Sequence, residues 1–387
     1  MQPDRHYNFS YMNNPFVTKG YAGEEYFCDR VKETGDLVNL LTNDNNMALI
    51  SPRRLGKTDL IHHCFAQPDI KDKYYTFIID IYATNSLADF VEVFGKAIFE
   101  ELKPLGRKAW ERFLTVITSI RQQISFDING NPVWGLGMGN FINPTTTLYE
   151  IFSYLDTADK PCIVAIDEFQ KILDYPNGEN VEASLRTYVQ RCPHATFIFC
   201  GSKRHMMTEI FLSPSRPFYQ SVITMGLSPI SEEKYAAFAS KQFAKGGKNL
   251  SVEVVPQVYR RFDGITAYLQ RVMNVLYLNT AKSETCTADM IEDAIDYILD
   301  LNSEHYETLF SQISEKQRQA FLAIASERRA KNVTSSQFVH KYRLSSPSSV
   351  ISAIRGLLDK DFITQDKDEY YVYDRFFQLW LEKRRLI

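Results

Sequence analysis

The residues with the clearest chemical potential follow an apolar run at 47–50 and read Ser51-Pro52-Arg53-Arg54-Leu55-Gly56-Lys57-Thr58. A strand, a loop that closes on Gly-Lys-Thr and an amphipathic helix are typical of a phosphate-binding loop. We expect Gly56 to let the backbone approach a phosphate, while the loop amides donate hydrogen bonds to it. Lys57 would supply charge to the outer phosphates, and the Thr58 hydroxyl suits Mg²⁺.

This loop departs from the usual eight-residue pattern at its first position, where Ser51 stands in place of glycine. That position mainly needs a turn at the end of a strand, which we expect a small residue to provide. Gly56 is the less replaceable of the two, because it lies against the phosphate. We therefore predict nucleotide contacts from the whole loop, Ser51 to Thr58, and from the next residue, Asp59.

A second chemical feature is the pair Asp167-Glu168, which ends the apolar run 161–166. Adjacent carboxylates at the end of a buried strand are unfavourable unless they meet a cation or a solvent cavity. In phosphate-loop enzymes the first acid holds Mg²⁺ through water, and the second orients or deprotonates the attacking water. We predict these roles for Asp167 and Glu168; the alternative is a solvated strand end.

Two further residues are weaker candidates. Ser202 follows the buried run 195–200, where it would either sense the terminal phosphate or cap the next helix. Arg216 lies in a proline-rich loop, from which it would reach a phosphate in its own or a neighbouring subunit, or remain a solvated surface arginine. The predicted catalytic set is therefore Lys57, Asp167, Glu168 and Arg216.

The order of apolar runs and helical patterns predicts the α/β class, a phosphate-loop parallel sheet flanked by helices. Expected strands are 47–50, 74–81, 161–166, 195–200 and 221–227, and a Gly- and Asn-rich segment at 126–141 suggests a hairpin insertion. From residue 231 the pattern is helical, with one long helix expected over 287–309. We predict three domains: an ATPase-like core at 1–229, a helical lid at 230–312 and a third module at 313–387.

The third module has the pattern of a winged helix-turn-helix: helices at 314–328, 335–341 and 345–359, then a hairpin. It carries 14 Lys and Arg against 9 Asp and Glu, a balance of +5, whereas the chain as a whole has −3. The third helix offers serine hydroxyls and Arg355, while the hairpin carries Asp366, Asp368 and Glu369, which a phosphate backbone would repel. Binding of DNA and docking of a protein both remain open.

Composition places few other limits. At 387 residues, 44% hydrophobic and 24% charged, the chain is ordinary for a soluble globular protein. No apolar run is long enough to cross a bilayer, and we expect no membrane partner. Six scattered cysteines without metal-binding spacing predict reduced core thiols and a cytoplasmic location.

The loop, the Ile166-Asp167-Glu168-Phe169-Gln170 segment, Phe27-Cys28-Asp29-Arg30 and the C-terminal residues 371–380 together resemble the archaeal-type ATPase family. That family belongs to the STAND branch of P-loop NTPases, which is related to AAA+ proteins. The resemblance implies ATP and Mg²⁺ as ligands, a catalytic Glu168, and hydrolysis coupled to a conformational switch. We expect slow basal turnover and a possible nucleotide-dependent oligomer. The alternative is a DNA-binding regulator or scaffold whose nucleotide is mainly structural.

Overall fold

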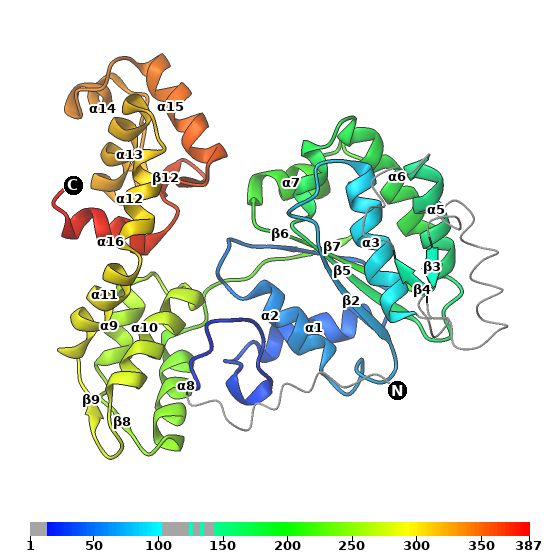
Figure 1. Ribbon diagram of the computed structural model, residues 1–387, viewed down its shortest axis with the longest axis horizontal. Coiled ribbons are helices and arrows are strands. Elements are labelled where there is room, and N and C mark those ends of the chain that lie inside the picture. The colour runs from blue at the N-terminus through cyan, green and yellow to red at the C-terminus, as the bar shows by residue number, and fades with distance from the viewer. Residues whose placement is uncertain (1–13, 103–123, 127–131, 135–142) are drawn as a thin grey trace. The chain divides into compact units, whose positions relative to one another are not determined.

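A computed structural model describes residues 14–102, 124–126, 132–134 and 143–387 (Figure 1). The chain divides into two compact units. Within the described residues, the first contains Val17–Tyr235 and Ile265–Ala267, and the second contains Asn14–Phe16, Ala236–Gly264 and Tyr268–Ile387. The three-domain division expected from the sequence stays a prediction.

The first unit is built on a five-stranded parallel sheet, counted over the described residues, with strand order β2-β5-β6-β1-β7. Strands β1, β5 and β6 are buried apolar runs, as expected where both faces of a sheet are covered, whereas the edge strand β7 is largely exposed. This confirms the predicted parallel sheet. The strands are β1 (Met47–Ile50), β2 (Tyr75–Asp80), β5 (Cys162–Asp167), β6 (Ala195–Gly201) and β7 (Ile223–Met225).

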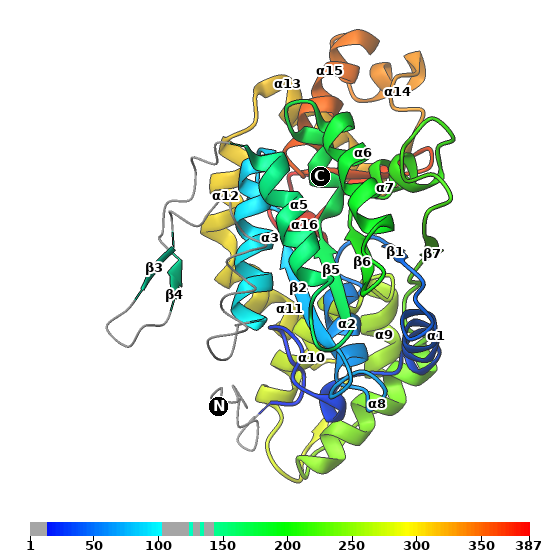
Figure 2. The same cartoon turned by 90° about the vertical axis from the view of Figure 1, so that its right-hand side faces the viewer.

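Helices cover both faces of this sheet (Figure 2). One face packs on α1 (Val31–Leu41) and α2 (Lys57–Phe65). The other packs on α3 (Leu87–Glu101), α5 (Pro144–Leu155), α6 (Gly178–Gln190) and α7 (Arg204–Leu212). Side chains alternate between the faces: Phe197 and Phe199 join the second core, and Ile198 joins the first.

Before the loop, the apolar pattern predicts one helix over 24–41. The structure has a short η2 (Glu24–Tyr26) and then α1, because Asp29 and Arg30 adopt left-handed backbone conformations between them. The expected insertion contains the antiparallel strands β3 (Ile124–Phe126) and β4 (Pro132–Trp134). The rest of that segment, and a helix expected at 110–120, lie outside the described residues.

Helices also form the segment from 232 to 311, as predicted: α8 (Glu232–Lys245), α9 (Val254–Arg261), α10 (Thr266–Asn279), α11 (Met290–Leu301) and α12 (Ser303–Ser311). A small parallel pair, β8 (Asn249–Leu250) with β9 (Thr285–Cys286), joins them. The single helix expected over 287–309 is wrong. The Asn302 side chain donates to the Ile298 carbonyl and ends α11, so that α12 begins anew.

The C-terminal part of the second unit has the predicted winged-helix elements. These are α13 (Glu315–Glu327), α14 (Ser336–Lys341), α15 (Pro347–Asp359), β11 (Ile363–Asp366) and β12 (Glu369–Val372). Each of the three helices starts at a serine whose hydroxyl accepts a backbone amide. Two elements were not predicted: β10 (Ala330–Lys331), which pairs with β12, and α16 (Arg375–Lys383).

Two general expectations can be compared with this fold. All six cysteines are buried and carry free thiols, as their spacing predicted. Among the described helices, none combines the length and apolar character needed to cross a membrane.

Candidate functional site

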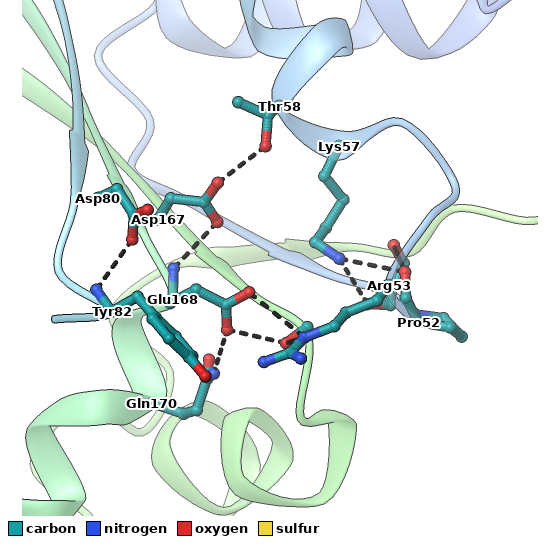
Figure 3. Close-up of polar contacts among 11 residues, drawn as sticks. Pro52, Arg53, Lys57, Thr58, Asp80, Tyr82, Asp167, Glu168 and Gln170 are labelled. Atoms are coloured by element: carbon teal, nitrogen blue, oxygen red, sulfur yellow. Dashed lines mark hydrogen bonds and ion pairs between the residues drawn. The ribbon is translucent and has the colours of Figure 1, made fainter. Parts of the chain in front are cut away.

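The polar residues singled out from the sequence meet at one edge of the sheet, where the parallel strands end. Asp80 on β2 pairs in register with Asp167 on β5, and Ile50 on β1 pairs with Gly201 on β6. Because carboxyl ends of parallel strands share an edge, the residues that follow β1, β5 and β6 are brought together there. Figure 3 shows the side chains of this edge.

The phosphate loop turns through two residues with positive φ, Arg54 (69°) and Gly56 (85°). Ser51 is not one of them, so a side chain at the first loop position carries no left-handed strain. Ser51 is buried, which explains why a small residue occupies this place. Gly56 precedes α2, and no side chain caps that helix. The N-terminus of α2 is therefore open to an anion.

Lys57 is the charged centre of the loop. Its side chain is only 8% exposed, and its Nζ donates to the carbonyl oxygens of Ser51 (2.9 Å) and Pro52 (3.1 Å). Burial lowers the pKa of Lys57, and the negative charges of Asp167 and Glu168 oppose that shift. A buried ammonium held by carbonyls alone still favours an anionic partner.

Asp167 faces the start of α2. The Thr58 hydroxyl donates to Asp167 Oδ2 at 2.8 Å, and the other carboxylate oxygen accepts the Glu168 amide at 2.9 Å (Figure 3). Asp80 lies on the neighbouring strand, where burial, joined by the charges of Asp167 and Glu168, raises its pKa. Three carboxylates thus share one edge with a hydroxyl, all of them hard oxygen donors.

Glu168 is fixed by a network of side chains. Its backbone is left-handed (φ 55°), which is uncommon outside glycine. Its Oε2 accepts hydrogen bonds from Ser202 (2.8 Å) and from Gln170, and its Oε1 lies 3.7 Å from Arg53 Nε. Arg53 Nε in turn donates to the Ser202 hydroxyl at 2.8 Å. The network links the phosphate loop with the ends of β5 and β6.

The structure therefore brings together the loop residues 51–58 with Asp167, Glu168 and Ser202. Ser202 does not cap the next helix, because α7 begins at Arg204 with Lys203 as its N-cap and no side-chain cap. Asp59 lies in the first turn of α2, where burial raises its pKa and His62 opposes the shift. The nucleotide contacts of all these residues remain predictions.

Arg216 does not belong to this network in the structure. Its guanidinium is 10% exposed and is hydrogen-bonded to the carboxylate of Glu182, which is completely buried. Glu179 and Glu209 each lie 3.6 Å from Arg216 Nη1. A buried carboxylate needs such a partner. These contacts give Arg216 a structural role as the partner of a buried acid, and its catalytic role stays a prediction.

Sequence reasoning missed several residues that position the site. Arg30 is buried and donates to the Leu55 carbonyl at 3.3 Å, which holds the loop from behind. The Tyr82 ring lies under the Arg53 guanidinium at 5.8 Å (Figure 3). Gln170 lies two residues after Glu168, so its place in the sequence could have marked it as a residue of the site. No local pattern indicates Arg30 or Tyr82, because their contacts join segments distant in sequence.

Comparisons with known proteins agree with this geometry. A family model described as an ATPase domain predominantly from Archaea matches residues 27–272, and one described as a probable winged helix domain matches residues 304–383. No curated protein matches the chain.

Solved structures show the same fold. The Walker-type ATPase PABY2304 of Pyrococcus abyssi aligns with a TM-score of 0.65 at 17% identity, over 95% of this chain and 99% of that one. The Aeropyrum pernix ORC2 protein, solved as ADPNP-ADP complexes, aligns with a TM-score of 0.55 at 12% identity, over 96% and 98% of the two chains. The predicted fold class, a P-loop ATPase core with a helical lid and a winged helix, is confirmed. The chain belongs to the ATPase domain family found predominantly in Archaea.

Proposed function

We propose that this protein binds ATP with Mg²⁺ at the phosphate loop and hydrolyses it slowly, as a conformational switch coupled to the winged helix. The observation that carries the proposal is the convergence of Lys57, Thr58, Asp167 and Glu168 at one edge of the sheet. Membership of the ATPase domain family supports it. The choice of ATP over other nucleotides rests on that family resemblance.

Phosphate binding would use charges and dipoles that the loop already holds in place. The uncapped start of α2 presents backbone amides and the positive end of the helix dipole. The Lys57 ammonium would exchange its two loop carbonyls for phosphate oxygens. Arg30 keeps the carbonyl of Leu55 turned away from the phosphate side by bonding it from behind.

The donors at the sheet edge fit Mg²⁺. Thr58 and Asp167 supply a hydroxyl and a carboxylate that lie within hydrogen-bond distance of each other. No group of three or more His, Cys, Asp or Glu among the described residues is arranged to hold a metal, and Mg²⁺ commonly needs only one or two protein carboxylates beside phosphate and water. When bound, Mg²⁺ would neutralise negative charge on the phosphates.

Glu168 would orient the attacking water and accept its proton. Its carboxylate oxygens already contact Ser202, Gln170 and Arg53, so an attacking water must compete with these partners for the carboxylate. The same contacts would hold it in one position beside Asp167. We therefore propose slow basal turnover, with Ser202 reporting the state of the loop to Glu168.

Turnover of the purified protein with Mg²⁺ tests the proposal most directly. Glu168→Gln should lower turnover at least about 100-fold and retain ATP binding, because only the proton acceptor is lost. Glu100→Gln, an exposed and chemically matched change on α3, should leave turnover unaltered. Loss of ATP binding in wild-type protein would sink the proposal, and full turnover in Glu168→Gln would remove Glu168 from its role.

The winged helix would bind DNA or a protein partner. Its third helix, α15, exposes Ser348, Ser352 and Arg355, whereas the wing acid Glu369 is paired with Arg329 and Lys331. Titrating labelled duplex DNA at low and high salt separates the two alternatives. DNA affinity that falls steeply with salt and weakens in Arg355→Gln would support DNA. Absence of binding at low salt would favour a protein partner.

A further inference from the structure

A second cationic site lies within the second unit, far in sequence from the phosphate loop. It is a cavity of about 630 Å³ bordered by α9, α11, the end of α13 and the start of α16. We call it the arginine pocket, because its lining includes Arg260, Arg261, Arg328, Arg329 and Arg375.

The positive charge of this pocket is not fully balanced. Its lining contains three carboxylates, Asp263, Glu292 and Glu327, against five arginines, which leaves a net charge of +2. Glu327 is already bonded by Lys341 and by the Tyr342 hydroxyl, at 2.5 and 2.7 Å. Its charge is therefore largely compensated by groups outside the pocket lining. Two of the arginines also have outside partners: Arg329 pairs with Glu369 at 3.1 Å, and Arg328 lies 3.4 Å from Glu382. The uncompensated charge therefore rests mainly on Arg260, Arg261 and Arg375.

The remaining ion pairs inside the pocket are long. Glu292 lies 3.9 Å from Arg261, and Asp263 lies 3.9 Å from Arg329 and 3.7 Å from Arg375. The nitrogens Arg261 Nε and Arg375 Nε are buried and have no hydrogen-bond partner within the described part of the chain. A buried donor without an acceptor is destabilising. These two guanidinium groups, both in the lining of the pocket, therefore retain donor capacity that the protein does not use.

Arg375 is held at this place despite unfavourable surroundings. It is the first residue of α16, where the helix dipole disfavours a cation. Burial lowers its pKa; the charge of Asp263 opposes that shift, and the charge of Arg328 adds to it. Its Nη1 donates to Gln378 at 2.5 Å, so the side chain is fixed even without an anion.

We propose that the arginine pocket binds a small anion carrying two or more phosphate groups. Guanidinium groups bind phosphate oxygens in pairs and keep their charge at every physiological pH. The cavity has the volume of a small-molecule site. Asp263 and Glu292 in its lining would repel a continuous nucleic-acid backbone, whereas a compact anion fits between separate arginines.

Such an anion would join elements on both sides of the cavity. Arg260 and Arg261 end α9, Arg328 and Arg329 follow α13, and Arg375 begins α16. A polyphosphate that bonds to several of them ties the helical segment 254–263 to the winged helix. The pocket would therefore change how firmly the winged helix is held within the second unit.

Calorimetry on the full chain tests the proposal, with Lys57→Ala as the background so that the phosphate loop does not contribute. Inorganic pyrophosphate should bind saturably without Mg²⁺. Adding Arg261→Gln or Arg328→Gln should weaken it roughly tenfold or more, since each removes a charged hydrogen bond. Both side chains are more than one-third exposed, so these variants should fold.

Two further variants make the test specific. Asp263→Asn should strengthen pyrophosphate binding several-fold, because it removes the negative charge between Arg329 and Arg375. Asparagine tolerates the left-handed backbone at this position (φ 53°). Arg191→Gln removes the same charge from an exposed position at the end of α6 and should leave pyrophosphate binding unaltered.

Comparing ATP with pyrophosphate shows whether the pocket binds a nucleoside polyphosphate or the phosphate groups alone. ATP binding more tightly than pyrophosphate would identify a nucleoside polyphosphate, and equal binding would identify the phosphates alone; both support the pocket. The proposal is overturned if pyrophosphate does not bind, or if Arg191→Gln weakens its binding as much as Arg261→Gln does. It is also overturned if only a single-stranded oligonucleotide binds in an Arg261-dependent way.

Discussion

The phosphate loop and the arginine pocket both gather positive charge, but they use different means. The loop relies on one buried ammonium, Lys57, beside backbone amides at the start of a helix. The pocket uses five guanidinium groups from three separate parts of the chain. At the loop, the acids follow β5, which β6 separates from β1, the strand that leads into the loop. In the pocket, acids and arginines share one lining.

This difference has a consequence for the chemistry available at each place. The loop combines a cation with ordered carboxylates, Asp167 and Glu168, so we expect it to bind a phosphate and also to move a proton. The pocket has carboxylates only as partners of its arginines, and arginine does not exchange its proton near neutral pH. We therefore expect catalysis at the loop and binding alone at the pocket.

The largest effect should come from Lys57→Ala. Removing the ammonium should lower ATP affinity about 100-fold and abolish measurable turnover, because no other described residue donates from that position. Calorimetry with ATP and a phosphate-release assay measure both. Lys96→Ala, on the exposed side of α3, is the matched control. Turnover that survives Lys57→Ala would break the assignment of catalysis to the loop.

A smaller effect is expected from Gly201→Ala. A methyl group there would collide with the Gln170 amide oxygen and with Met207, displacing the side chain that donates to Glu168. We expect a loss of about 1–3 kcal/mol in unfolding free energy and lower turnover. Pyrophosphate binding at the arginine pocket should not change. Urea unfolding and turnover assays provide the measurements.

Gly35→Ala is the control for that substitution. Gly35 lies inside α1, and nothing stands within 4 Å of an added methyl group. Alanine should therefore stabilise the protein by about 0.5–1 kcal/mol. Equal destabilisation by both changes would show that Gly201 has no special contact with the Glu168 network.

The contrast between the two regions also explains what the sequence could predict. The loop is a continuous stretch after a strand, and the acids end another strand, so local pattern located both. The parallel sheet and the winged-helix elements were predictable for the same reason, because their periodicity is local. The end of α11 at Asn302 was not, since it depends on a side-chain bond to Ile298 that competes with continued helix.

Contacts between distant segments could not be predicted. From the sequence, Arg216 was either a solvated surface arginine or a residue that reaches a phosphate. The fold shows that it pairs with the buried carboxylate of Glu182. The bonds of Arg53 to Ser202 and Glu168 join residues more than 100 positions apart. The arginine pocket draws on residues 260 to 375, and no local motif marks them. The charge balance of a segment can indicate that a cationic site exists, but it does not show which residues of the fold come together to form it.

A more modest change in turnover is expected from Arg53→Gln. Arg53 is partly exposed, and its pairing with Glu168 is worth at most about 1 kcal/mol. Releasing the carboxylate should leave one of its oxygens available to the attacking water and raise basal turnover roughly fivefold. Arg191→Gln, exposed at the end of α6, is the control. A fall in turnover would instead indicate that Arg53 acts directly on phosphate.

The smallest predicted effect is a dependence of the unfolding free energy on pH. It should come from a histidine of the first unit, because the arginines of the pocket keep their charge near neutral pH. His63 on α2 is buried, stacked on Phe27 at 4.2 Å, with the Tyr21 hydroxyl 2.9 Å from its Nδ1. Burial lowers the pKa of His63 below its usual 6.5, and the charge of Glu24 opposes that shift. Between the lowered pKa and 6.5, the unfolded chain binds more protons than the folded one, so stability rises with pH across this window.

Acidification below pH 6.5 should therefore reduce the unfolding free energy, by no more than about 1.4 kcal/mol per pH unit for one proton. His63→Gln should remove that part of the slope, because glutamine does not titrate. His305→Gln, which changes an exposed histidine on α12, should leave the slope as it is. Urea unfolding at several pH values measures it. Identical slopes in wild type and His63→Gln would mean that His63 binds protons equally in the folded and unfolded chain, so that its burial would not lower its pKa.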